Sequence, residues 1–371
     1  MPSIPILDLG PEVEELWPQL NEAIQKVLRS QQFIMGPEVT LFEEEVAAWL
    51  GSKHAIALNS GTDALVIGLR ALGVGAGDEV LTSPFTFFAT AEAISSVGAT
   101  PVFIDIDPQT FNLDPEKLEE YITPETRAII PVHLYGQACD MARIKDIAEK
   151  HGLKILEDVA QAFGATFGHR KLGTLGHAGA FSFFPSKVLG CYGDGGLLAT
   201  DDDNIAQDAR MLRVHGARRK YFNEVVGYNS RLDALQAAIL RVKLPYVDQW
   251  CRDRQGVASI YDRALAGVAN LKAPVAAGWG EHVYHQYTVR IAGGLRDAVK
   301  NHLESEGVST MIYYPVPVHQ LPLYQGCGAT VPVAEQAARE VLSLPIWPQM
   351  GQEIVERVAG SLISGMRAVV S

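Results

Sequence analysis

The sequence has few cysteines and no cysteine pair of the kind that binds zinc. Its four cysteines lie far apart in the 371-residue chain and form no CxxC pair. This argues against a metal site and against a disulfide-stapled scaffold. No stretch approaches the roughly 20 apolar residues of a membrane-spanning helix, and the first residues do not have the pattern of a signal peptide. The sequence therefore predicts a reduced, cytoplasmic protein that does not contact a membrane.

Positive charge is also scarce. Lys and Arg total 31 against 43 Asp and Glu, which gives a net charge of −12. Because an acidic chain repels phosphate backbones, we expect no nucleic-acid partner. The G-x-G-x-x-G fingerprint of a Rossmann dinucleotide site is missing as well, since the glycines of 73–79 precede a predicted strand instead of opening a helix. A nicotinamide oxidoreductase is thus a remote alternative.

What the sequence does have is a regular alternation of apolar strands and helices. The strands are predicted over 54–58, 79–84, 100–107, 127–135, 154–160, 178–184 and 195–201. Helices are predicted between them over 62–72, 87–98, 116–122 and 141–152. This alternation is typical of an α/β fold with a mostly parallel sheet covered on both faces.

The pattern changes after Arg231. A long helix runs from there through Pro245 to about residue 267, and the segments beyond it are less regular. The sequence therefore predicts a large α/β domain over 1–245 and a smaller α+β domain over 246–371. Ligands of a mostly parallel sheet bind beyond the carboxyl ends of its strands, so the chemistry is expected just after the strands of the large domain.

The first motif of this kind is NSGTDAL, which follows the strand over 54–58. A Ser-Gly-Thr turn that opens a helix presents free backbone N–H groups and hydroxyls to an anion. The amides of Gly61, Thr62 and Asp63 could hold a phosphate in this way. The alternative is a structural helix cap made by Ser60 or Thr62.

The second motif is LEDVAQ, in which Asp158 ends an otherwise apolar strand. A carboxylate buried there needs a cationic partner. A pyridinium nitrogen is one such partner, because a nearby carboxylate keeps it protonated and makes a pyridoxal-phosphate ring a good electron sink. Gln161 could reach the phenolic oxygen of that ring. The alternative is a helix cap or a structural ion pair.

The third motif is SFFPSKVLGCYGDGG, in which Lys187 follows a strand and a proline. A lysine in an apolar, glycine-rich environment is a candidate for covalent cofactor attachment, because desolvation makes its neutral amine available. Ser182 could bind the phosphate. The alternative is a solvated lysine beside a turn. The order of the three motifs, each just past a strand, favours a pyridoxal-phosphate (PLP) enzyme.

Over nearly its whole length the chain resembles the DegT/DnrJ/EryC1/StrS family of sugar aminotransferases. The motifs that carry the resemblance are FIMGPEVTLFEEEVAAWLG, NSGTDAL, GDEVLTSPFTFFATAEAI, AIIPVHLYGQ, LEDVAQAFGA, SFFPSKVLGCYGDGG and GYNSRLDALQAAIL. The resemblance implies a fold-type I, aspartate aminotransferase-like architecture with a seven-stranded sheet. It also implies the cofactor pyridoxal 5′-phosphate and a homodimer with shared active sites.

The resemblance further implies a role for each candidate residue. Lys187 would bind the cofactor covalently as a Schiff base, Asp158 would pair with the ring nitrogen, and Gln161 would contact the ring oxygen. Phe87 would stack on the ring, where relatives often carry Trp. The phosphate would be surrounded by Gly61, Thr62, Asp63, Ser182 and Asn229 of the partner subunit. The nucleotide-sugar would be contacted by Arg231, Tyr313 and Tyr314.

The resemblance also narrows the reaction. Family members that act as dehydratases carry histidine in place of the lysine, so Lys187 favours transamination. The closest type aminates C3 of UDP-2-acetamido-2-deoxy-3-keto-glucuronate for surface polysaccharides, with L-glutamate as the donor and 2-oxoglutarate as its product. Alternatives are C3 amination of a dTDP-3-keto-6-deoxyhexose, C4 amination of a 4-keto nucleotide sugar and, remotely, a PLP-binding regulator. Relatives often carry His at the position of Tyr313, which leaves the substrate contacts open.

A basic cluster remains without an assigned role. It consists of Arg213, His215, Arg218 and Arg219 in an otherwise acidic chain. Such a cluster could hold a diphosphate or a glucuronate carboxylate. It could equally be a solvated loop, and the sequence does not separate the two.

Overall fold

A seven-stranded sheet forms the centre of the protein. The structure, a computed structural model, describes residues 3–370. In spatial order the strands are β1 (His54–Leu58), β9 (Gly196–Thr200), β8 (Ala178–Ser182), β5 (Lys154–Asp158), β4 (Thr126–Ile130), β2 (Glu79–Thr82) and β3 (Thr100–Phe103). Only β9 runs antiparallel to its neighbours in this sheet of the described chain. The predicted mostly parallel sheet is confirmed.

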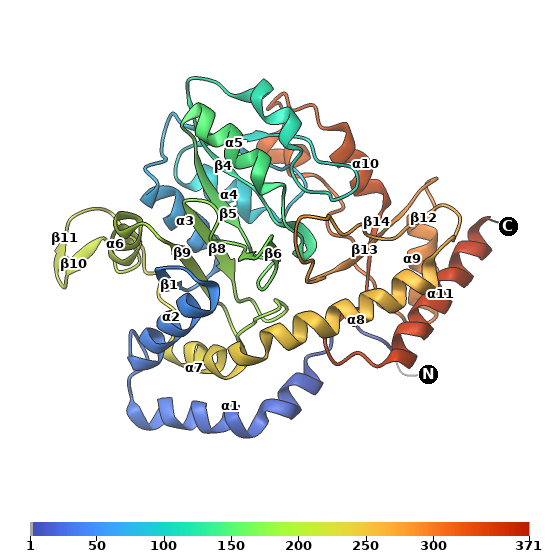
Figure 1. Ribbon diagram of the computed structural model, residues 1–371, viewed down its shortest axis with the longest axis horizontal. Coiled ribbons are helices and arrows are strands. Elements are labelled where there is room, and N and C mark those ends of the chain that lie inside the picture. The colour runs from blue at the N-terminus through green and yellow to red at the C-terminus, as the bar shows by residue number, and fades with distance from the viewer. Residues whose placement is uncertain (1–2, 371) are drawn as a thin grey trace.

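Helices cover both faces of the sheet (Figure 1). One face packs against α2 (Pro37–Leu50), α5 (Met141–His151) and α7 (Ala234–Lys243). The other packs against α3 (Gly61–Ala71), α4 (Ala89–Ser96) and α6 (Asp203–Leu212). Helix α1 (Gly10–Ser30) lies along α7 on the outside. The sheet is therefore sandwiched between two helical layers, as the strand–helix alternation predicts.

The alternation of side chains along β5 decides where its two acidic residues point. Successive side chains of a strand face opposite sides of the sheet. Ile155 joins the core formed with α2, α5 and α7, whereas Leu156 joins the core formed with α3, α4 and α6. Glu157 therefore lies on the α5 side, and Asp158 lies on the side of α3 and α4.

Two of the predicted helices differ in the structure. The segment over 116–122 forms a 3-10 helix, Pro115–Tyr121, capped by the side chain of Asp114. The long helix after Arg231 is interrupted by a 3-10 turn, Leu244–Tyr246, because Pro245 cannot donate a backbone hydrogen bond inside a helix. Helix α8 (Val247–Leu265) begins directly after that turn.

The C-terminal part is a smaller α+β unit around a second apolar core. Its elements around this core are α8, β12 (Leu271–Lys272), β13 (Tyr287–Ile291), α9 (Arg296–Ser305), β14 (Val341–Leu344) and α11 (Gln352–Val370). Helix α10 (Pro332–Glu340) packs in a separate apolar cluster with Phe85 and Tyr135. Figure 1 shows α8 running from the central sheet to α9 and α11. The first turns of α8 pack in the core of the large sheet and its later turns in the second core. The division at residue 245 stays a prediction.

Short elements complete the described chain. Two hairpins are formed by β6 (Thr166–Phe167) with β7 (Arg170–Lys171) and by β10 (Ala217–Arg219) with β11 (Phe222–Asn223). Further 3-10 helices span Leu134–Gly136, Val318–Gln320 and Pro322–Tyr324. Among residues 3–370, no helix is long and apolar enough to cross a membrane. All four cysteines are free thiols, and the described residues contain no cluster of three or more metal-ligating side chains.

Candidate active site

A cavity of about 560 Å³ lies at the carboxyl ends of β1, β5 and β8. Its wall is formed by the loop from β1 to α3, the start of α4, the end of β5, the loop from β8 to β9, and the segments 285–286 and 313–314. The predicted site residues on this wall are Gly61, Thr62, Phe87, Asp158, Gln161, Ser182, Lys187, Tyr313 and Tyr314. The strand-end rule thus located the cavity from the sequence.

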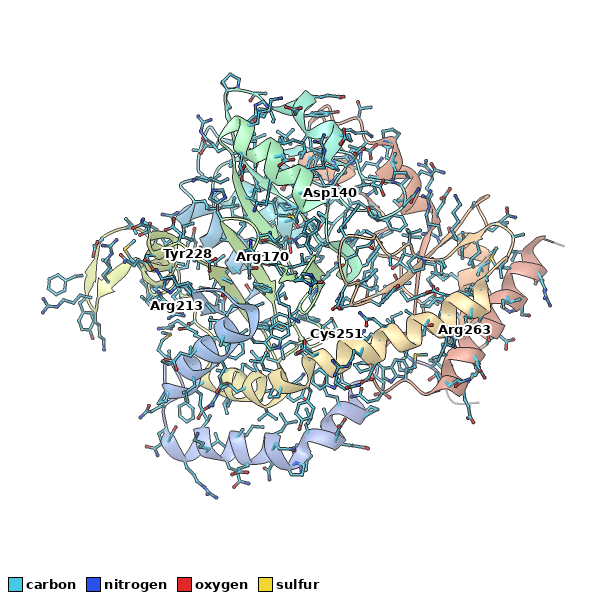
Figure 2. The ribbon with its side chains drawn as sticks, in the orientation of Figure 1. Asp140, Arg170, Arg213, Tyr228, Cys251 and Arg263 are labelled. Carbon is cyan, nitrogen blue, oxygen red and sulfur yellow. The ribbon has the colours of Figure 1, made fainter. Side chains whose placement is uncertain are left out.

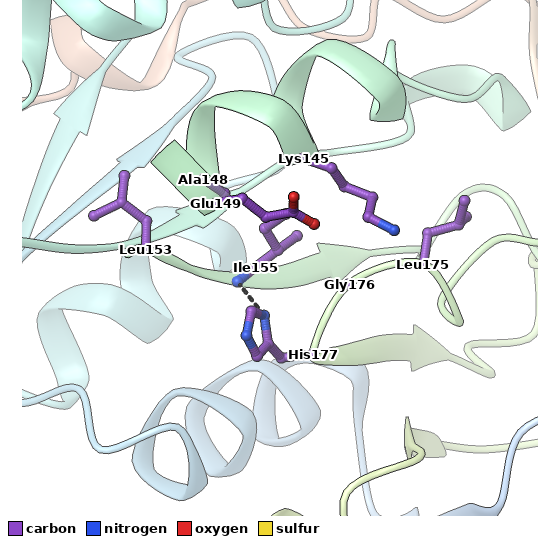
Figure 3. Close-up of a pocket in the computed structure, with 8 residues that line it drawn as sticks. All are labelled: Lys145, Ala148, Glu149, Leu153, Ile155, Leu175, Gly176 and His177. Carbon is purple, nitrogen blue, oxygen red and sulfur yellow. Dashed lines mark hydrogen bonds between the residues drawn. The ribbon is translucent and has the colours of Figure 1, made fainter. Parts of the chain in front are cut away.

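A smaller cavity of about 140 Å³ lies at the opposite edge of the sheet (Figure 3). It is lined by Lys145 and Glu149 of α5 and by His177, which precedes β8. The Nδ1 atom of His177 accepts a hydrogen bond from the N–H of Ile155 at 3.1 Å, so this ring ties the loop to β5. Because the cavity lies at the amino ends of β5 and β8, it is not where a parallel sheet binds its ligand.

The loop between β1 and α3 presents a helix N-terminus to the larger cavity. Ser60 caps the helix, because its Oγ accepts a hydrogen bond from the N–H of Asp63 at 3.1 Å. Gly61 packs so closely on the end of β8 that a Cβ atom there would lie 2.7 Å from the Cβ of Ser182. The two alternatives from the sequence, a structural cap and an anion site, are compatible, since the first N–H groups of a helix lack intrahelical partners. Asp63 serves the cap and does not line the cavity.

Asp158 ends β5 with its carboxylate buried in the cavity wall. The hydroxyl of Thr90 on α4 donates to Oδ2 at 2.8 Å, and the N–H of Ala160 donates to Oδ1 at 3.1 Å. Burial raises the pKa of the Asp158 carboxyl, and these hydrogen bonds together with the charge of Lys187 only partly oppose it. A ligand cation beside the carboxylate would supply the missing stabilisation.

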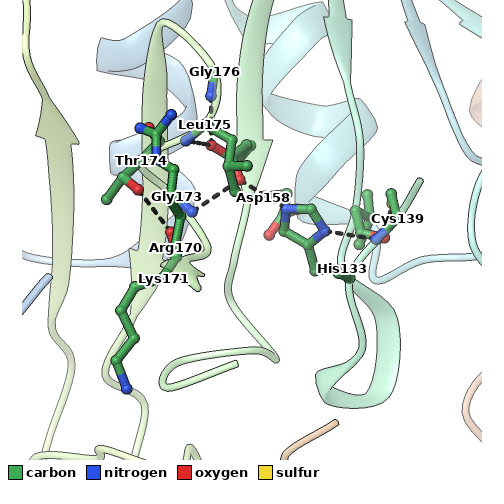
Figure 4. Close-up of polar contacts among 12 residues, drawn as sticks. His133, Cys139, Asp158, Arg170, Lys171, Gly173, Thr174, Leu175 and Gly176 are labelled. Carbon is green, nitrogen blue, oxygen red and sulfur yellow. Dashed lines mark hydrogen bonds and ion pairs between the residues drawn. The ribbon is translucent and has the colours of Figure 1, made fainter. Parts of the chain in front are cut away.

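A second buried carboxylate fixes the end of β5 from the opposite face. Glu157 contacts Nε2 of His133 at 3.1 Å and accepts backbone N–H groups of the 173–176 loop at 2.7 to 2.9 Å. Nδ1 of His133 accepts the N–H of Cys139 (Figure 4), so Nε2 carries the proton that faces Glu157. Burial raises the pKa of Glu157, but His133 and the loop hold it below its ordinary value. This network joins β4, β5 and the loop, and so holds the backbone of Asp158 in place.

Lys187 lies on the wall of the same cavity, in the loop that joins β8 to β9. Its N–H donates to the carbonyl of Phe184 at 2.8 Å, which closes a tight turn after β8. Burial lowers the pKa of the Lys187 amine to about 8, while the charge of Asp158 acts in the opposite direction. The neutral amine, which is the nucleophile and the base, is therefore accessible near physiological pH. A solvated surface lysine does not match this position.

This environment predicts how Lys187 titrates in the cofactor-free chain. Only the neutral amine reacts with acetic anhydride, so the labelling of Lys187, followed by mass spectrometry, should rise through a midpoint near pH 8. In an Asp158→Asn variant the midpoint should fall further, because the charge that favours the ammonium is gone. An unchanged or higher midpoint in that variant would contradict the coupling between the two groups.

Gln161 is held between two tyrosines at the cavity wall. Its Oε1 accepts the N–H of Tyr135 at 2.8 Å, and its Nε2 donates to the hydroxyl of Tyr314 at 2.8 Å. The hydroxyl of Tyr135 in turn donates to the carbonyl of Tyr313. Phe87 is 60% exposed, and its ring centroid lies 6.4 Å from that of Tyr314. An exposed phenyl ring at a cavity offers a face on which a flat ligand can stack.

Asn229 and Arg231 lie outside the cavity of their own chain. Asn229 is exposed, whereas Ser230 beside it is buried. The Ser230 hydroxyl donates to Oδ1 of Asn59 at 3.0 Å, which ties the segment to the end of β1. Within one chain, therefore, the exposed Asn229 side chain has no place in the phosphate loop.

The basic cluster of the sequence separates in the structure. Arg213 is buried at the end of α6, where it binds Glu43 of α2 and the carbonyl of Ala57, as its position beside α2 in Figure 2 illustrates. Arg218 pairs with Asp208 at 3.5 Å on the surface. Both alternatives for the cluster, an anion site and a solvated loop, are thus wrong for Arg213, whose charge is neutralised inside the fold.

Several residues of the cavity wall escaped the sequence analysis, among them Thr90, His285 and Gln286. Thr90 lies in the first turn of α4, where nothing in the local pattern distinguishes it from a core residue. His285 and Gln286 precede β13 in the C-terminal part, and only the folded chain brings them to the loop of Lys187. None of the three follows a strand of the central sheet, which was the signal that located the others.

Comparison with known proteins identifies the family of the chain. Residues 15–363 match the DegT/DnrJ/EryC1/StrS aminotransferase family. The chain is 46% identical to the pleiotropic regulatory protein of Geobacillus stearothermophilus, with 96% of this chain and 98% of that protein covered. It is 45% identical to the dTDP-3-amino-3,4,6-trideoxy-alpha-D-glucose transaminase of Streptomyces venezuelae, with 96% and 94% covered. It is 44% identical to the UDP-2-acetamido-2-deoxy-3-oxo-D-glucuronate aminotransferase of Pseudomonas aeruginosa, with 97% and 99% covered.

A solved structure extends the similarity to the whole fold. The crystal structure of S. venezuelae DesV in complex with a ketimine intermediate superposes with a TM-score of 0.96, at 44% identity and with 99% of each chain covered. The fold is likewise shared with a DegT DnrJ EryC1 StrS aminotransferase from Brucella abortus, at a TM-score of 0.92 and 38% identity, with 96% of this chain and 98% of that chain covered. The chain belongs to the DegT/DnrJ/EryC1/StrS aminotransferase family, and its cofactor is pyridoxal 5′-phosphate.

Proposed function

We propose that this aminotransferase moves the amino group of L-glutamate onto C3 of a nucleotide-linked 3-keto sugar. The observation that carries the proposal is the position of Lys187 and Asp158 in one cavity, beside the N-terminus of α3. The first candidate substrate is UDP-2-acetamido-2-deoxy-3-keto-glucuronate, the sugar in the name of the P. aeruginosa relative. Its product would serve surface polysaccharide synthesis.

The residues of the cavity fit pyridoxal phosphate. The N-terminus of α3, with the hydroxyls of Thr62 and Ser182, would hold the phosphate. The buried carboxylate of Asp158 would meet the ring nitrogen and gain the cation that it lacks in the chain alone. Gln161 would contact the ring oxygen, and the exposed ring of Phe87 would stack on the cofactor. Each polar end of the cofactor thus has a matching group.

The chemistry then divides between the cofactor and the chain. Bound pyridoxal phosphate supplies a sink for the electrons released when a proton leaves the carbon that bears the amine. Nζ of Lys187 would take that proton from the α-carbon of glutamate, and in the second half-reaction would deliver a proton to C3 of the sugar. Proton transfer by a positioned side chain contributes roughly 10²–10⁴-fold. Donor and acceptor use one cavity in turn, so ping-pong kinetics are expected.

The test is an assay of L-glutamate with UDP- and dTDP-linked 3-keto and 4-keto sugars, with NMR of the product. Release of 2-oxoglutarate and a new C3 amine on the UDP sugar would support the proposal. Preference for a dTDP-3-keto-6-deoxyhexose, which the S. venezuelae relative makes the second candidate, or for a 4-keto sugar would change the substrate. No turnover with any sugar would favour the regulator that the Geobacillus relative is named for.

We also propose that two copies of the chain share each active site. Phe33, Ile34 and Met35 expose large apolar side chains, and the carbonyl of Phe33 accepts the N–H of Ala234, close to the Asn229 segment. Exposed apolar clusters of this kind mark protein interfaces. Asn229 of the partner subunit would then reach the phosphate, and Arg231 of the partner subunit the sugar nucleotide.

Shared sites predict complementation between two inactive variants. A chain with Lys187→Ala and a chain with Asn229→Ala each lack one group in every site of their own homodimers. After mixing and exchange, one site of each hybrid dimer has both groups, so about a quarter of the wild-type activity should return if dimers form at random. A chain carrying both substitutions, mixed with the Lys187→Ala chain, is the control and should recover nothing. Absence of recovery in verified hybrids would contradict sharing.

Two further features belong to this proposal. The enzyme would work in the cytoplasm, where keto-sugar nucleotides and reduced thiols are found together. The domains would divide near residue 245, with the cofactor held mainly by the large domain. Residues 285–286 and the Tyr313–Tyr314 pair of the C-terminal part line the same cavity. A movement of the small domain toward the large one would therefore move these side chains relative to the bound cofactor.

A further inference from the structure

His285 is a buried imidazole that the mechanism above does not use. It is 7% exposed and lines the cavity that contains Lys187. Its Nδ1 atom is buried and has no hydrogen-bond partner among residues 3–370. Buried polar atoms without a partner are rare in folded proteins, and each calls for an explanation. Since Nδ1 has almost no accessible surface, the nitrogen that can meet a polar group in the cavity is Nε2, which is not among the buried atoms without a partner.

The backbone around His285 is held rigidly. Arg254 of α8, itself buried, donates from one guanidinium nitrogen to the carbonyls of Tyr284 at 3.3 Å, His285 at 3.5 Å and Ile346 at 3.2 Å. On the other side, Nδ1 of His282 accepts the N–H of Tyr284 at 2.9 Å, and the two rings stack 3.9 Å apart. The segment is thereby fixed from both sides, so the imidazole enters the cavity in a defined orientation.

The electrostatic surroundings keep this imidazole neutral. Burial lowers the pKa of His285 well below its ordinary value, and the charges of Lys187 and Arg254 act in the same direction. The other titratable groups on the cavity wall are Asp158, Asp194, Tyr313 and Tyr314. A neutral imidazole has one N–H and one lone pair, so His285 can accept a hydrogen bond without taking up a proton.

Lys187 needs such an acceptor at one stage of the cycle. Its Nζ has no hydrogen-bond partner among the described residues, and its side chain is partly buried at the cavity wall, where desolvation lowers the pKa of the amine. When the lysine is not bound to the cofactor and has taken up a proton, it is an ammonium in a desolvated place, which is costly without an acceptor. The carboxylate whose charge acts on Lys187, that of Asp158, already accepts from Thr90 and Ala160 and would be engaged by the cofactor ring.

We propose that Lys187, once it is released from the cofactor and protonated, turns from its position in the structure and donates a hydrogen bond from its ammonium to the neutral imidazole of His285 on the same cavity wall, which keeps that group aimed at the reacting carbon. His285 is then a positioning residue that acts through Lys187. The inference rests on the proposed role of Lys187, and it adds a residue from the C-terminal part to that role.

The first test is the pH titration of Lys187 by acetic anhydride in the cofactor-free full chain. An acceptor stabilises the ammonium and raises the pKa of the lysine. His285→Leu should therefore move the labelling midpoint below that of the wild type. His285→Asn and His285→Gln place an amide oxygen near the positions of Nδ1 and Nε2, and one of them should restore the midpoint. An unmoved midpoint in the leucine variant, or no restoration by either amide, would overturn the proposal.

A second measurement separates positioning from proton transfer. In the holoenzyme, the half-reaction with L-glutamate should slow by up to about 100-fold in His285→Leu, because a small displacement of a catalytic group has effects of this size. The KM for glutamate should change little, since the lost contact is not with the substrate. The amide that restores the midpoint should also restore this rate. If neither amide does, His285 carries the proton itself and the positioning role is wrong.

Two controls complete the design. His282→Asn changes a buried histidine of the same segment that is absent from the cavity wall, and keeps an acceptor for the N–H of Tyr284. Its labelling midpoint should match that of the wild type. If it shifted as much as the midpoint of His285→Leu, the shift would come from altered packing of the segment, and the inference would be wrong. Added pyridoxal phosphate should protect Lys187 from labelling in the wild type. Lack of protection would contradict the proposed function of Lys187 and not the contact with His285.

Discussion

Replacing Lys187 with alanine is expected to lower turnover by at least about 10⁴-fold, the upper range of a positioned proton-transfer group. Two functions are lost together, because the amine is both the covalent attachment point and the base. The amine is suited to both, since burial lowers its pKa to about 8 while the charge of Asp158 limits the shift. Borohydride reduction followed by mass spectrometry should find the cofactor on Lys187 in the wild type and nowhere in the variant.

Two further variants decide whether the loss is specific. Lys187→Arg keeps a cation but cannot attach the cofactor, so it should be as inactive as the alanine variant. Lys243 is a buried lysine away from the cavity, where its Nζ pairs with Glu12 at 2.7 Å and donates to the carbonyl of Gly190. Lys243→Met should lower the melting temperature and still retain the cofactor on Lys187. Turnover that persists in Lys187→Ala would place the catalytic amine elsewhere.

The central sheet could be predicted because its signal is local. Each strand is a short apolar run followed by a turn, and the helices between them have regular apolar spacing. The candidate residues Asp158, Ser182 and Lys187 followed from the same pattern, since the ends of parallel strands meet at one edge of the sheet. The reversal of β9 could not be predicted in this way. All residues of β9 are buried, so its apolar pattern contains no signal for the direction in which the strand runs.

The residues that the sequence did not reveal depend on contacts between distant segments. Arg213 reads as part of a basic cluster, yet it is neutralised by Glu43, which belongs to a helix far away in the chain. Thr90 supplies the hydroxyl that Asp158 accepts, but only the packing of α4 against β5 brings the two together. His285 reaches the cavity of Lys187 only because α8 carries the C-terminal part back to it, where Arg254 holds the backbone of His285. Local periodicity contains none of this information.

Replacing Asp158 with asparagine is expected to reduce activity by roughly 10²–10³-fold, the size of effect seen when one preorganised electrostatic group is removed. Asparagine has nearly the same shape, so the loss would come from the charge. Its Oδ1 can still accept the N–H of Ala160. The hydroxyl of Thr90 lies 3.0 Å from that of Thr86, and either one can donate, so Thr90 can turn to accept from the new amide. Stopped-flow absorbance with L-glutamate measures the half-reaction that should slow.

The same substitution should stabilise the cofactor-free chain, which separates a loss of charge from a loss of structure. Burial raises the pKa of Asp158 above its value in the unfolded chain, so the charged carboxylate opposes folding. This penalty is absent below the unfolded pKa, grows as the pH rises toward the folded pKa and is fully present above it. The melting temperature of the cofactor-free Asp158→Asn variant should therefore exceed that of the wild type at neutral pH, and the difference should vanish as the pH falls.

A buried aspartate with a structural role provides the contrast. Asp105 accepts the N–H groups of Val333 and Ala334 and pairs with Lys117 at 3.2 Å, so Asp105→Asn removes a satisfied contact and should lower the melting temperature. We thus expect Asp158→Asn to melt higher and Asp105→Asn to melt lower than the wild type, with activity lost mainly in Asp158→Asn. This combination would mean that the fold tolerates a destabilising charge at Asp158 because the cofactor needs it. If Asp158→Asn melted lower and kept its half-reaction, Asp158 would be a structural acid and the ring nitrogen would need another partner.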